Sequence, residues 1–269
     1  MEKLEHPLWI VDAANRIFGP AVNALLGLFG MRAADPANPI PNYLVIAYLV
    51  VLGLVALAFV LRSRLSVENP GKLQIVFEDI VGGLSGMLSD IVGPKGPAYI
   101  SLVGTIGAFI LACNLIGMVP GFMSPTSSIN VTLGCALTVW VYYHYHGMKE
   151  QGIGPYLKHF AAPPGAPLFI APIMLPVEII SHFSRVLSLS LRLFGNVFGE
   201  ELVILILFSI VPFFAPLPIM FLGMITMPLQ AFIFVMLTMI YLGGAVAAEH
   251  GHEEAHGHGE AAGAHGAVA

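Results

Sequence analysis

Two long stretches of this chain contain no Asp, Glu, Lys or Arg, and they limit the possible folds more than any other feature. One stretch lies between Lys95 and Lys149, and the other runs from Leu202 to Ala248. A membrane-spanning helix needs roughly 20 predominantly apolar residues. Each stretch is therefore long enough for about two spans, or for one long and tilted span.

The composition points the same way. Of the 269 residues, 57% are hydrophobic and 10% are charged, a balance that soluble domains rarely show. The formal net charge of −5 is small and gives no indication of a nucleic-acid partner, so none is expected. The two cysteines, Cys113 and Cys135, are expected to pack as small apolar residues, and they indicate neither a metal site nor a disulfide framework.

Five apolar segments predict transmembrane helices: residues 43–61, 98–118, about 129–147, about 169–208 and about 217–247. Residues 73–92 carry three acidic side chains that interrupt an apolar face, which is typical of an amphipathic helix on the membrane surface. The sequence thus predicts an all-α, polytopic membrane protein. We expect about five transmembrane helices, one amphipathic surface helix and a long, tilted helix hairpin in the C-terminal half.

The chain is expected to have three parts. Residues 1–42 form an N-terminal extracytoplasmic or interfacial segment, 43–248 a single membrane domain and 249–269 a flexible tail rich in His, Gly and Ala. The first residues lack the basic region, apolar core and small-residue cleavage site of a secretory signal, so no cleaved signal is expected.

The tail contains HEEAH at residues 252–256, a formal match to the zinc-protease motif H-E-x-x-H. That chemistry needs a rigid helix, a third ligand and a substrate cleft, which a low-complexity stretch does not offer. A solvated tail is the preferred interpretation, with weak binding of a transition metal and zinc-dependent proteolysis as alternatives. No cofactor and no metal site are expected.

Five spans would place the two termini on opposite sides of the membrane. The loops at 119–128 and 209–218 contain no Lys or Arg, whereas six basic residues fall on the other side: Arg62, Arg64, Lys72, Lys95, Lys149 and Lys158. Cytoplasmic loops carry an excess of Lys and Arg. We therefore expect the N-terminus outside and the C-terminus in the cytoplasm.

Arg192 lies within SLSLRLFGNVFGEELVILIL, residues 188–207, which otherwise reads as membrane. An arginine at the centre of a membrane helix costs about 2.5 to 3.5 kcal/mol on the insertion scale, so it needs a reason. A helix over 169–208 would be about 60 Å long, about twice the thickness of the hydrocarbon layer. It must tilt steeply, bend or emerge from the membrane.

At 100° per residue, one stripe of this helix holds polar or small residues: Glu178, Ser181, Arg185, Ser188, Arg192, Gly195 and Gly199. Glu200 and Glu201 follow Arg192 by eight and nine residues, beyond the neighbours at i+3 and i+4. Arg192 is either a structural group that snorkels or forms an ion pair, or part of an ion pathway. Ionisable groups inside a membrane favour the second interpretation, and the balancing charge then comes from elsewhere, with another subunit as one source.

Three further residues are candidates for this site with different weight. Gln230 is the only strongly polar side chain in the last span, so it should face Arg192 or a cavity rather than lipid. His182 could titrate near neutral pH, but a lone helical histidine is more often packed, so it ranks below Glu178. Arg185 lies nearer the cytoplasmic end, where snorkelling explains it.

The motifs LSLSLRLFGNVFGEEL, PLQAFIFVMLTMIYL, NLIGMVPGFMSPTSSINVTL and NPGKLQ together resemble the a subunit of bacterial F-type ATP synthase. The resemblance covers residues from about 43 to 247. It implies a non-catalytic stator subunit that conducts protons through two offset half-channels to and from a carboxylate of the rotating c-ring, which couples the ion gradient to ATP synthesis. The implied partners are c-ring subunits, the b subunits of the peripheral stalk and the lipid of the bacterial inner (plasma) membrane.

The resemblance also implies residue roles. Arg192 matches the family's essential arginine, which keeps the c-ring carboxylate deprotonated and blocks a direct leak; its guanidinium stays charged where a lysine would not be guaranteed to. Asn196, Glu201 and Gln230 match the half-channel open to the outside, and Glu178 with Ser181 matches the one open to the cytoplasm. The full set of candidate ion-translocation residues is Arg192, Glu201, Gln230, Asn196, Glu178, Ser181, His182, Ser188 and Glu200.

Two positions depart from the family pattern. Some relatives have a histidine in the last span that partners the outer glutamate, and Gly223 stands there in this chain. Some also have a membrane acid near Asn114, where this chain has Gly117. The outer path could then use Glu200, water or another partner.

Two other classes of function remain open from the residues alone. A self-contained transporter or channel would also place charges in the membrane, although no inverted repeat is evident. A purely structural scaffold would leave the intramembrane polar residues costly and unexplained: Arg192, Glu178, Glu201 and Gln230.

Overall fold

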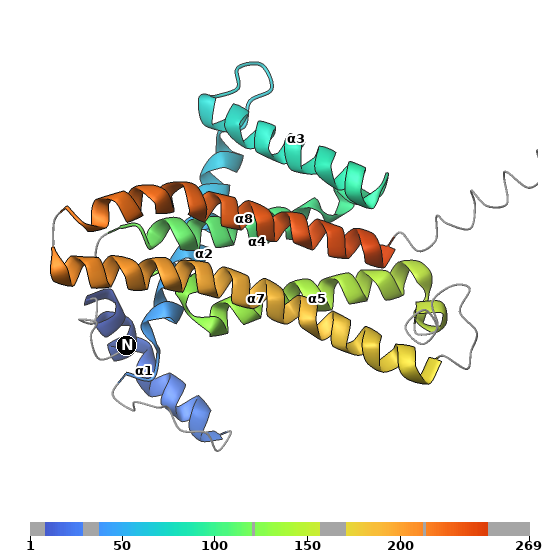
Figure 1. Ribbon diagram of the computed structural model, residues 1–269. Coiled ribbons are helices and arrows are strands. Elements are labelled where there is room, and N and C mark those ends of the chain that lie inside the picture. Colours follow the sequence, from blue (N-terminus) through green and yellow to red (C-terminus); the bar gives the residue numbers. More distant parts are fainter. Residues whose placement is uncertain (1–8, 29–37, 120–121, 157–170, 212–213, 247–269) are drawn as a thin grey trace, which may run out of the picture. The chain divides into compact units, whose positions relative to one another are not determined.

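A computed structural model describes residues 9–28, 38–119, 122–156, 171–211 and 214–246 (Figure 1). Every element in this part of the chain is a helix, which confirms the all-α class. The elements are α1 (Trp9–Leu28), α2 (Asn42–Ser63), α3 (Lys72–Val92), the 3-10 turn η1 (Gly96–Tyr99), α4 (Ile100–Ile116), the 3-10 turn η2 (Pro125–Ser127), α5 (Ile129–Gln151), α7 (Ala171–Ile210) and α8 (Pro216–Val246). The tail with HEEAH lies outside the described residues.

Four helical segments are long and apolar enough to cross a membrane: Asn42–Ser63, Gly96–Ile116, Pro172–Ile210 and Pro216–Val246. They coincide with four of the five expected spans. The fifth expected span is also helical, as α5, but its second half carries the polar run YYHYHGMKEQ and is less apolar than the other four. The chain is therefore a polytopic helical membrane protein.

The amphipathic segment forms α3, a single helix whose only buried residues are Leu88 and Val92. It ends where Gly93 adopts φ +96°, a left-handed conformation that costs a glycine little. The Gly93 N–H bonds to the Ser89 carbonyl at 3.0 Å and so satisfies one of the last free carbonyls of the helix. Gly152, with φ +82°, ends α5 in the same way.

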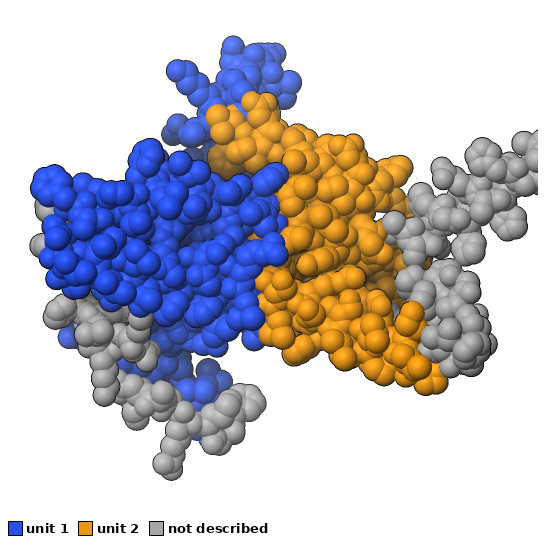
Figure 2. Space-filling view, viewed as in Figure 1, with its two compact units in different colours: residues 1–75, 106–134, 190–233 blue, residues 76–105, 135–189, 234–269 orange. Residues whose placement is uncertain are grey.

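The described chain forms two compact units, each built from several separate segments (Figure 2). Unit 1 comprises residues 1–75, 106–134 and 190–233, and unit 2 comprises 76–105, 135–189 and 234–269. Both α7 and α8 thus contribute a part to each unit. Every contact described below lies within one unit.

In unit 1, the side chain of Asn15 links α1 to the segment before α2. Its Nδ2 donates to the Ile40 carbonyl at 3.1 Å, and its Oδ1 accepts from the Ile40 N–H at 2.9 Å. α2 contacts both α1 and η2. The apolar helix α2 therefore has two neighbours within unit 1.

The parts of α7 and α8 in unit 1 run antiparallel, and two polar pairs define their alignment. Asn196 is hydrogen-bonded to Gln230, and Glu200 is hydrogen-bonded to Thr226. Four residues forward on α7 therefore correspond to four residues back on α8. This spacing is one turn of helix on each side, so both pairs lie along one helix–helix seam.

In unit 2, polar contacts hold the C-terminal end of α5 to its neighbours. Gln151 Nε2 donates to the Ala245 carbonyl of α8 at 2.7 Å, and Lys95 Nζ donates to Glu150 Oε2 at 2.6 Å. The hydrogen bond from Lys95 lowers the pKa of Glu150 below its ordinary value of 4.5. The end of α5 is therefore tied to α8 and to the turn before α4.

Candidate functional site

Arg192 lies on an exposed face of α7 in unit 1. Within the described part of the chain, no carboxylate lies within ion-pair distance of its guanidinium. Gly195 and Gly199 follow at helical spacing, and a Cβ added at either would meet no atom within 4 Å. The helix face next to Arg192 therefore carries small residues with open space around them. No carboxylate of the described residues balances the charge of the guanidinium.

One turn beyond Arg192, the amide of Asn196 reaches α8. Its Nδ2 donates to Gln230 Oε1 at 2.7 Å, and Gln230 is 5% exposed. Both side chains line a cavity of about 410 Å³ between the two helices, together with Glu200, Thr226 and mainly apolar residues. A cavity of this size with polar groups on its wall can hold several water molecules.

Glu200 directs its carboxyl group from α7 toward α8. Its Oε2 accepts a hydrogen bond from Thr226 Oγ1 at 3.2 Å. Its Oε1 is buried and has no hydrogen-bond partner among the described residues. The Oε1 atom fills the space beside Gly223, because a Cβ at that glycine would overlap it. The glycine thus makes room for this acid.

Glu201 points to a different neighbour, the loop between α4 and α5. Its Oε1 accepts from the backbone N–H of Ser124 at 2.7 Å. Consecutive helix positions differ by 100° in direction, so the two adjacent glutamates face different partners. The two acids therefore have separate environments, and only Glu200 lines the cavity.

The loop that holds Glu201 is built from buried hydroxyl groups. Ser124 and Thr126 are both fully buried, with their hydroxyl oxygens 2.6 Å apart. Ser124 Oγ donates to the Cys113 carbonyl at 2.9 Å, and Thr126 Oγ1 donates to Asn114 Oδ1 at 2.6 Å. Asn114 Nδ2 in turn lies 3.3 Å from the Met227 carbonyl of α8. The network fixes the loop against α4 and α8.

The packing around Gly117, just after the end of α4, leaves no room for an acidic side chain. A Cβ at Gly117 would lie 2.7 Å from the Ser124 Cβ, closer than real Cβ atoms approach. The space that a side chain would take in a relative is filled here by the Ser124 loop. The absence of an acid at 117 and the hydroxyl network are thus two aspects of the same packing.

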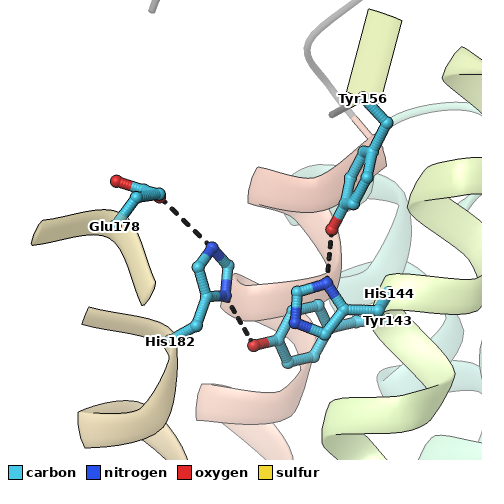
Figure 3. Close-up of polar contacts among 5 residues, drawn as sticks. All are labelled: Tyr143, His144, Tyr156, Glu178 and His182. Carbon is cyan, nitrogen blue, oxygen red and sulfur yellow. Dashed lines mark hydrogen bonds and ion pairs between the residues drawn. The ribbon is translucent and has the colours of Figure 1, made fainter. Parts of the chain in front are cut away.

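The remaining candidates lie in unit 2. Glu178 Oε1 lies 3.2 Å from His182 Nε2, and the other ring nitrogen of His182, Nδ1, lies 2.8 Å from the Tyr143 hydroxyl (Figure 3). Ser181 is half-buried and Ser188 is exposed, and neither side chain is hydrogen-bonded to another described residue. The structure therefore connects Glu178 with His182 but does not join the two serines to them.

A second histidine packs against the first. The rings of His144 and His182 are 4.8 Å apart, and His144 Nδ1 lies 2.6 Å from the Tyr156 hydroxyl. Burial raises the pKa of Tyr156 to about 12, so this hydroxyl stays protonated and can donate a hydrogen bond to His144 Nδ1. Unit 2 thus contains a compact cluster of ionisable and hydroxyl side chains.

The sequence of the chain matches a family of known proteins. The model of the family described as ATP synthase A chain matches residues 43–243. The chain belongs to this ATP synthase family. It is a membrane-sector subunit of ATP synthase, a multi-pass membrane protein of ATP synthesis and proton transport whose partners lie within that complex.

Three relatives show how far the similarity to ATP synthase subunit a extends. ATP synthase subunit a of Solibacter usitatus is 44% identical over 230 residues, 86% of this chain and 97% of the relative. That of Koribacter versatilis is 38% identical over 250 residues, 93% of this chain and all of the relative. ATP synthase subunit a 3 of Pelobacter propionicus is 45% identical over 215 residues, 80% of this chain and 87% of the relative.

Sequence reasoning did not select several residues of this ATP synthase subunit that contact the candidates or the side chains next to them. They are Asn114, Ser124, Thr126, Tyr143, Tyr156 and Thr226. A signal was present, since polar residues inside charge-free membrane segments usually have partners. Their partners were not evident, because the pairs join segments far apart in the sequence.

Proposed function

We propose that this subunit is the stator that conducts protons through two offset half-channels to and from a carboxylate of a rotating c-ring. The observation that carries the proposal is Arg192: a permanent cation on an open helix face, without a carboxylate beside it in the described chain. A carboxylate on a neighbouring, moving subunit would balance it. In that position the guanidinium keeps the passing carboxylate ionised and prevents protons from crossing directly.

Four residues of unit 1 support an outer half-channel, which we define as Asn196, Glu200, Glu201 and Gln230. The Asn196–Gln230 pair and the Glu200 carboxyl share one cavity wall. The unpaired Oε1 of Glu200 can accept a hydrogen bond from water in that cavity. Glu201 contributes a second carboxylate, held by the Ser124 loop. Water and these groups together would provide a path for protons to the c-ring carboxylate that faces Arg192.

The inner half-channel, which we define as Glu178, Ser181, His182 and Ser188, lies along α7 in unit 2. The Glu178–His182 contact supports a role in proton uptake, since both groups can hold and release a proton. The two serines supply hydroxyl groups at helical spacing toward Arg192. This half-channel opens to the cytoplasm in the proposed orientation.

The proposed setting follows from the charge distribution and the family. The chain sits in the bacterial inner membrane with its N-terminus outside and its C-terminus in the cytoplasm, because its basic loops lie on one side. Residues 43–248 form the membrane domain, flanked by 1–42 and the tail 249–269. Its partners are c-ring subunits and the b subunits of the peripheral stalk. The subunit has no bond-breaking site of its own, and it guides protons only.

Arg192→Ala tests the proposal in inverted membrane vesicles that contain the whole complex. We expect ATP-driven proton pumping to fall to background while the complex still assembles. Arg64→Ala, which removes an exposed guanidinium at the end of α2, is the matched control and should pump normally. Normal pumping by the Arg192→Ala complex would refute the proposal. The alternative of a self-contained transporter predicts transport by the purified chain alone, reconstituted without a ring of small subunits.

A further inference from the structure

Tyr143 of α5 completes a hydrogen-bonded row that begins at Glu178 of α7 (Figure 3). Glu178 Oε1 is 3.2 Å from His182 Nε2, and His182 Nδ1 is 2.8 Å from the Tyr143 hydroxyl. The Glu178 side chain is 37% exposed, whereas Tyr143 is 2% exposed. The row therefore leads from an accessible carboxylate through an imidazole to a buried phenol, all within unit 2.

The chemistry of the three groups fixes the positions of their protons. An ionised carboxylate only accepts hydrogen bonds, so the ring nitrogen that faces Glu178 carries a hydrogen. In neutral His182 the opposite nitrogen, Nδ1, is then an acceptor, and the Tyr143 O–H donates to it. When the ring gains a proton, both ring nitrogens are donors, and the same hydroxyl can rotate to accept from Nδ1. A hydroxyl is thus an uncharged group that can bond to Nδ1 in both states, as the donor to the neutral ring and as the acceptor from the charged ring.

We propose that Tyr143 is a positioning residue of the inner half-channel, whose hydroxyl lets His182 take up a proton beside Glu178 and release it again. One proton enters from the cytoplasmic water and resides on the imidazole, while the Tyr143 hydroxyl rotates from donor to acceptor. On release the imidazole loses that proton and the hydroxyl rotates back. No other bond changes. The inference rests on the proposed function, because it assigns this row to the path that supplies the c-ring.

The groups that face His182 set how readily it charges. On its own helix these are Glu178, whose carboxylate lies 3.2 Å from Nε2, and Arg185, which follows three residues later. From α5, Tyr143 bonds to the ring and His144 packs against it. From α8, Tyr241 lies under the Arg185 guanidinium, whose Cζ is 5.4 Å from the ring centroid. Tyr156, which follows α5, is hydrogen-bonded to His144. In this set Tyr143 is a neutral group whose hydroxyl lies within hydrogen-bond distance of Nδ1.

Tyr143→Phe tests the role, with ATP-driven pumping in inverted vesicles measured against the pH of the medium, which bathes the cytoplasmic side. Hydrogen bonds to charged groups are about twice as strong as those between neutral groups, so losing the hydroxyl weakens the imidazolium more than the neutral ring. We expect the midpoint of the alkaline fall in rate to move to lower pH by about 1 unit, a tenfold lower proton affinity. Tyr142→Phe makes the same change one residue earlier and should leave the midpoint in place.

His182→Gln provides the second arm. Glutamine can bond to both neighbours but cannot hold a proton, so this variant should lose the midpoint, and adding Tyr143→Phe should change nothing further. The proposal is overturned if Tyr143→Phe superimposes on the unmodified complex, or if its shift persists in the His182→Gln background. If the Tyr143→Phe complex does not assemble, an unchanged midpoint in His182→Gln overturns it. Failure of the proposed function is separate: it would show as pumping by Arg192→Ala.

Discussion

The carboxyl group of Glu200 on α7 occupies the space that a side chain at Gly223 on α8 would fill. Relatives with a histidine at the position of Gly223 would place a titratable ring there. In this chain the titratable group comes from the other helix of the seam and reaches the same place. If Glu200 carries protons as proposed, the small residue at position 223 is what allows its carboxyl group to reach this place.

Gly223→Ala should lower proton pumping, because the new methyl group overlaps Glu200 Oε1 and displaces the carboxyl group from the cavity wall. Crowding a packed site by one methyl costs about 1–3 kcal/mol, which corresponds to a loss of roughly 5- to 150-fold if it falls on the conducting state. Pumping in vesicles measures the loss. Gly53→Ala on α2, where no atom lies within 4 Å, is the control. Unimpaired pumping by Gly223→Ala would mean that Glu200 does not need this position.

Substitutions of Glu201 by Gln and by Ala separate a role in proton transfer from a role in holding the Ser124 loop. Glu201→Gln keeps an oxygen that accepts the Ser124 N–H but cannot ionise, whereas Glu201→Ala loses both properties. If Glu201 carries protons, both variants should slow conduction by a similar factor, without abolishing it because water can partly substitute. Passive proton conduction after removal of the catalytic sector measures this. A normal rate for Glu201→Gln with a defect for Glu201→Ala would reduce Glu201 to an anchor of the loop.

Gly117→Ala should loosen the loop that holds Glu201. The added Cβ would lie 2.7 Å from the Ser124 Cβ and 3.2 Å from its backbone nitrogen, the atom that binds the acid. We expect a destabilisation of about 1–3 kcal/mol and a smaller yield of assembled complex. Gly104→Ala, within α4 and with open space around it, should assemble at the normal yield. Equal yields of the two variants would contradict the close approach of the loop.

The Lys95–Glu150 pair should make stability depend on pH at acid values. Because the Lys95 hydrogen bond lowers the pKa of Glu150, the pair contributes stability above the ordinary pKa of 4.5 and loses it as the pH falls further. The pair is accessible to solvent, so the gain over Glu150→Gln should be at most about 1 kcal/mol at neutral pH. Thermal unfolding in detergent at neutral pH and at about pH 3.5 measures it. Glu68→Gln, which removes a carboxylate without an ion pair in the described chain, should show no such change.

The helices followed from the sequence because apolar length and helix-breaking residues are local signals. The 40-residue α7 was expected over 169–208 and extends from Ala171 to Ile210. The surface helix expected over 73–92 is α3, from Lys72 to Val92. α5 also begins where expected, but its polar second half makes it less apolar than a typical span. Within the N-terminal segment, Trp9–Leu28 form the helix α1, whose bounds the sequence analysis did not predict.

The partners of the candidate residues were less accessible to sequence reasoning. Helical periodicity gives the direction in which Glu200 and Glu201 point, but not which segment lies there. Ser124 lies 77 residues before its partner Glu201, and Tyr143 lies 39 residues before His182. Such pairs depend on how helices pack, and packing is decided by side chains from several segments at once. Gly117 and Gly223 depart from the family pattern in the sequence. Only the structure shows that Ser124 and Glu200 occupy the space beside them.

The two polar pairs along the α7–α8 seam, Asn196 with Gln230 and Glu200 with Thr226, also restrict how the hairpin can change in length. One residue inserted within either helix between these positions would turn the later partner by 100° and shift it by about 1.5 Å, which breaks at least one of the pairs. Point substitutions leave this alignment untouched. Insertions and deletions are therefore compatible with the seam only in the turn between the helices or beyond the paired positions, where they do not alter the count of residues from one polar contact to the next.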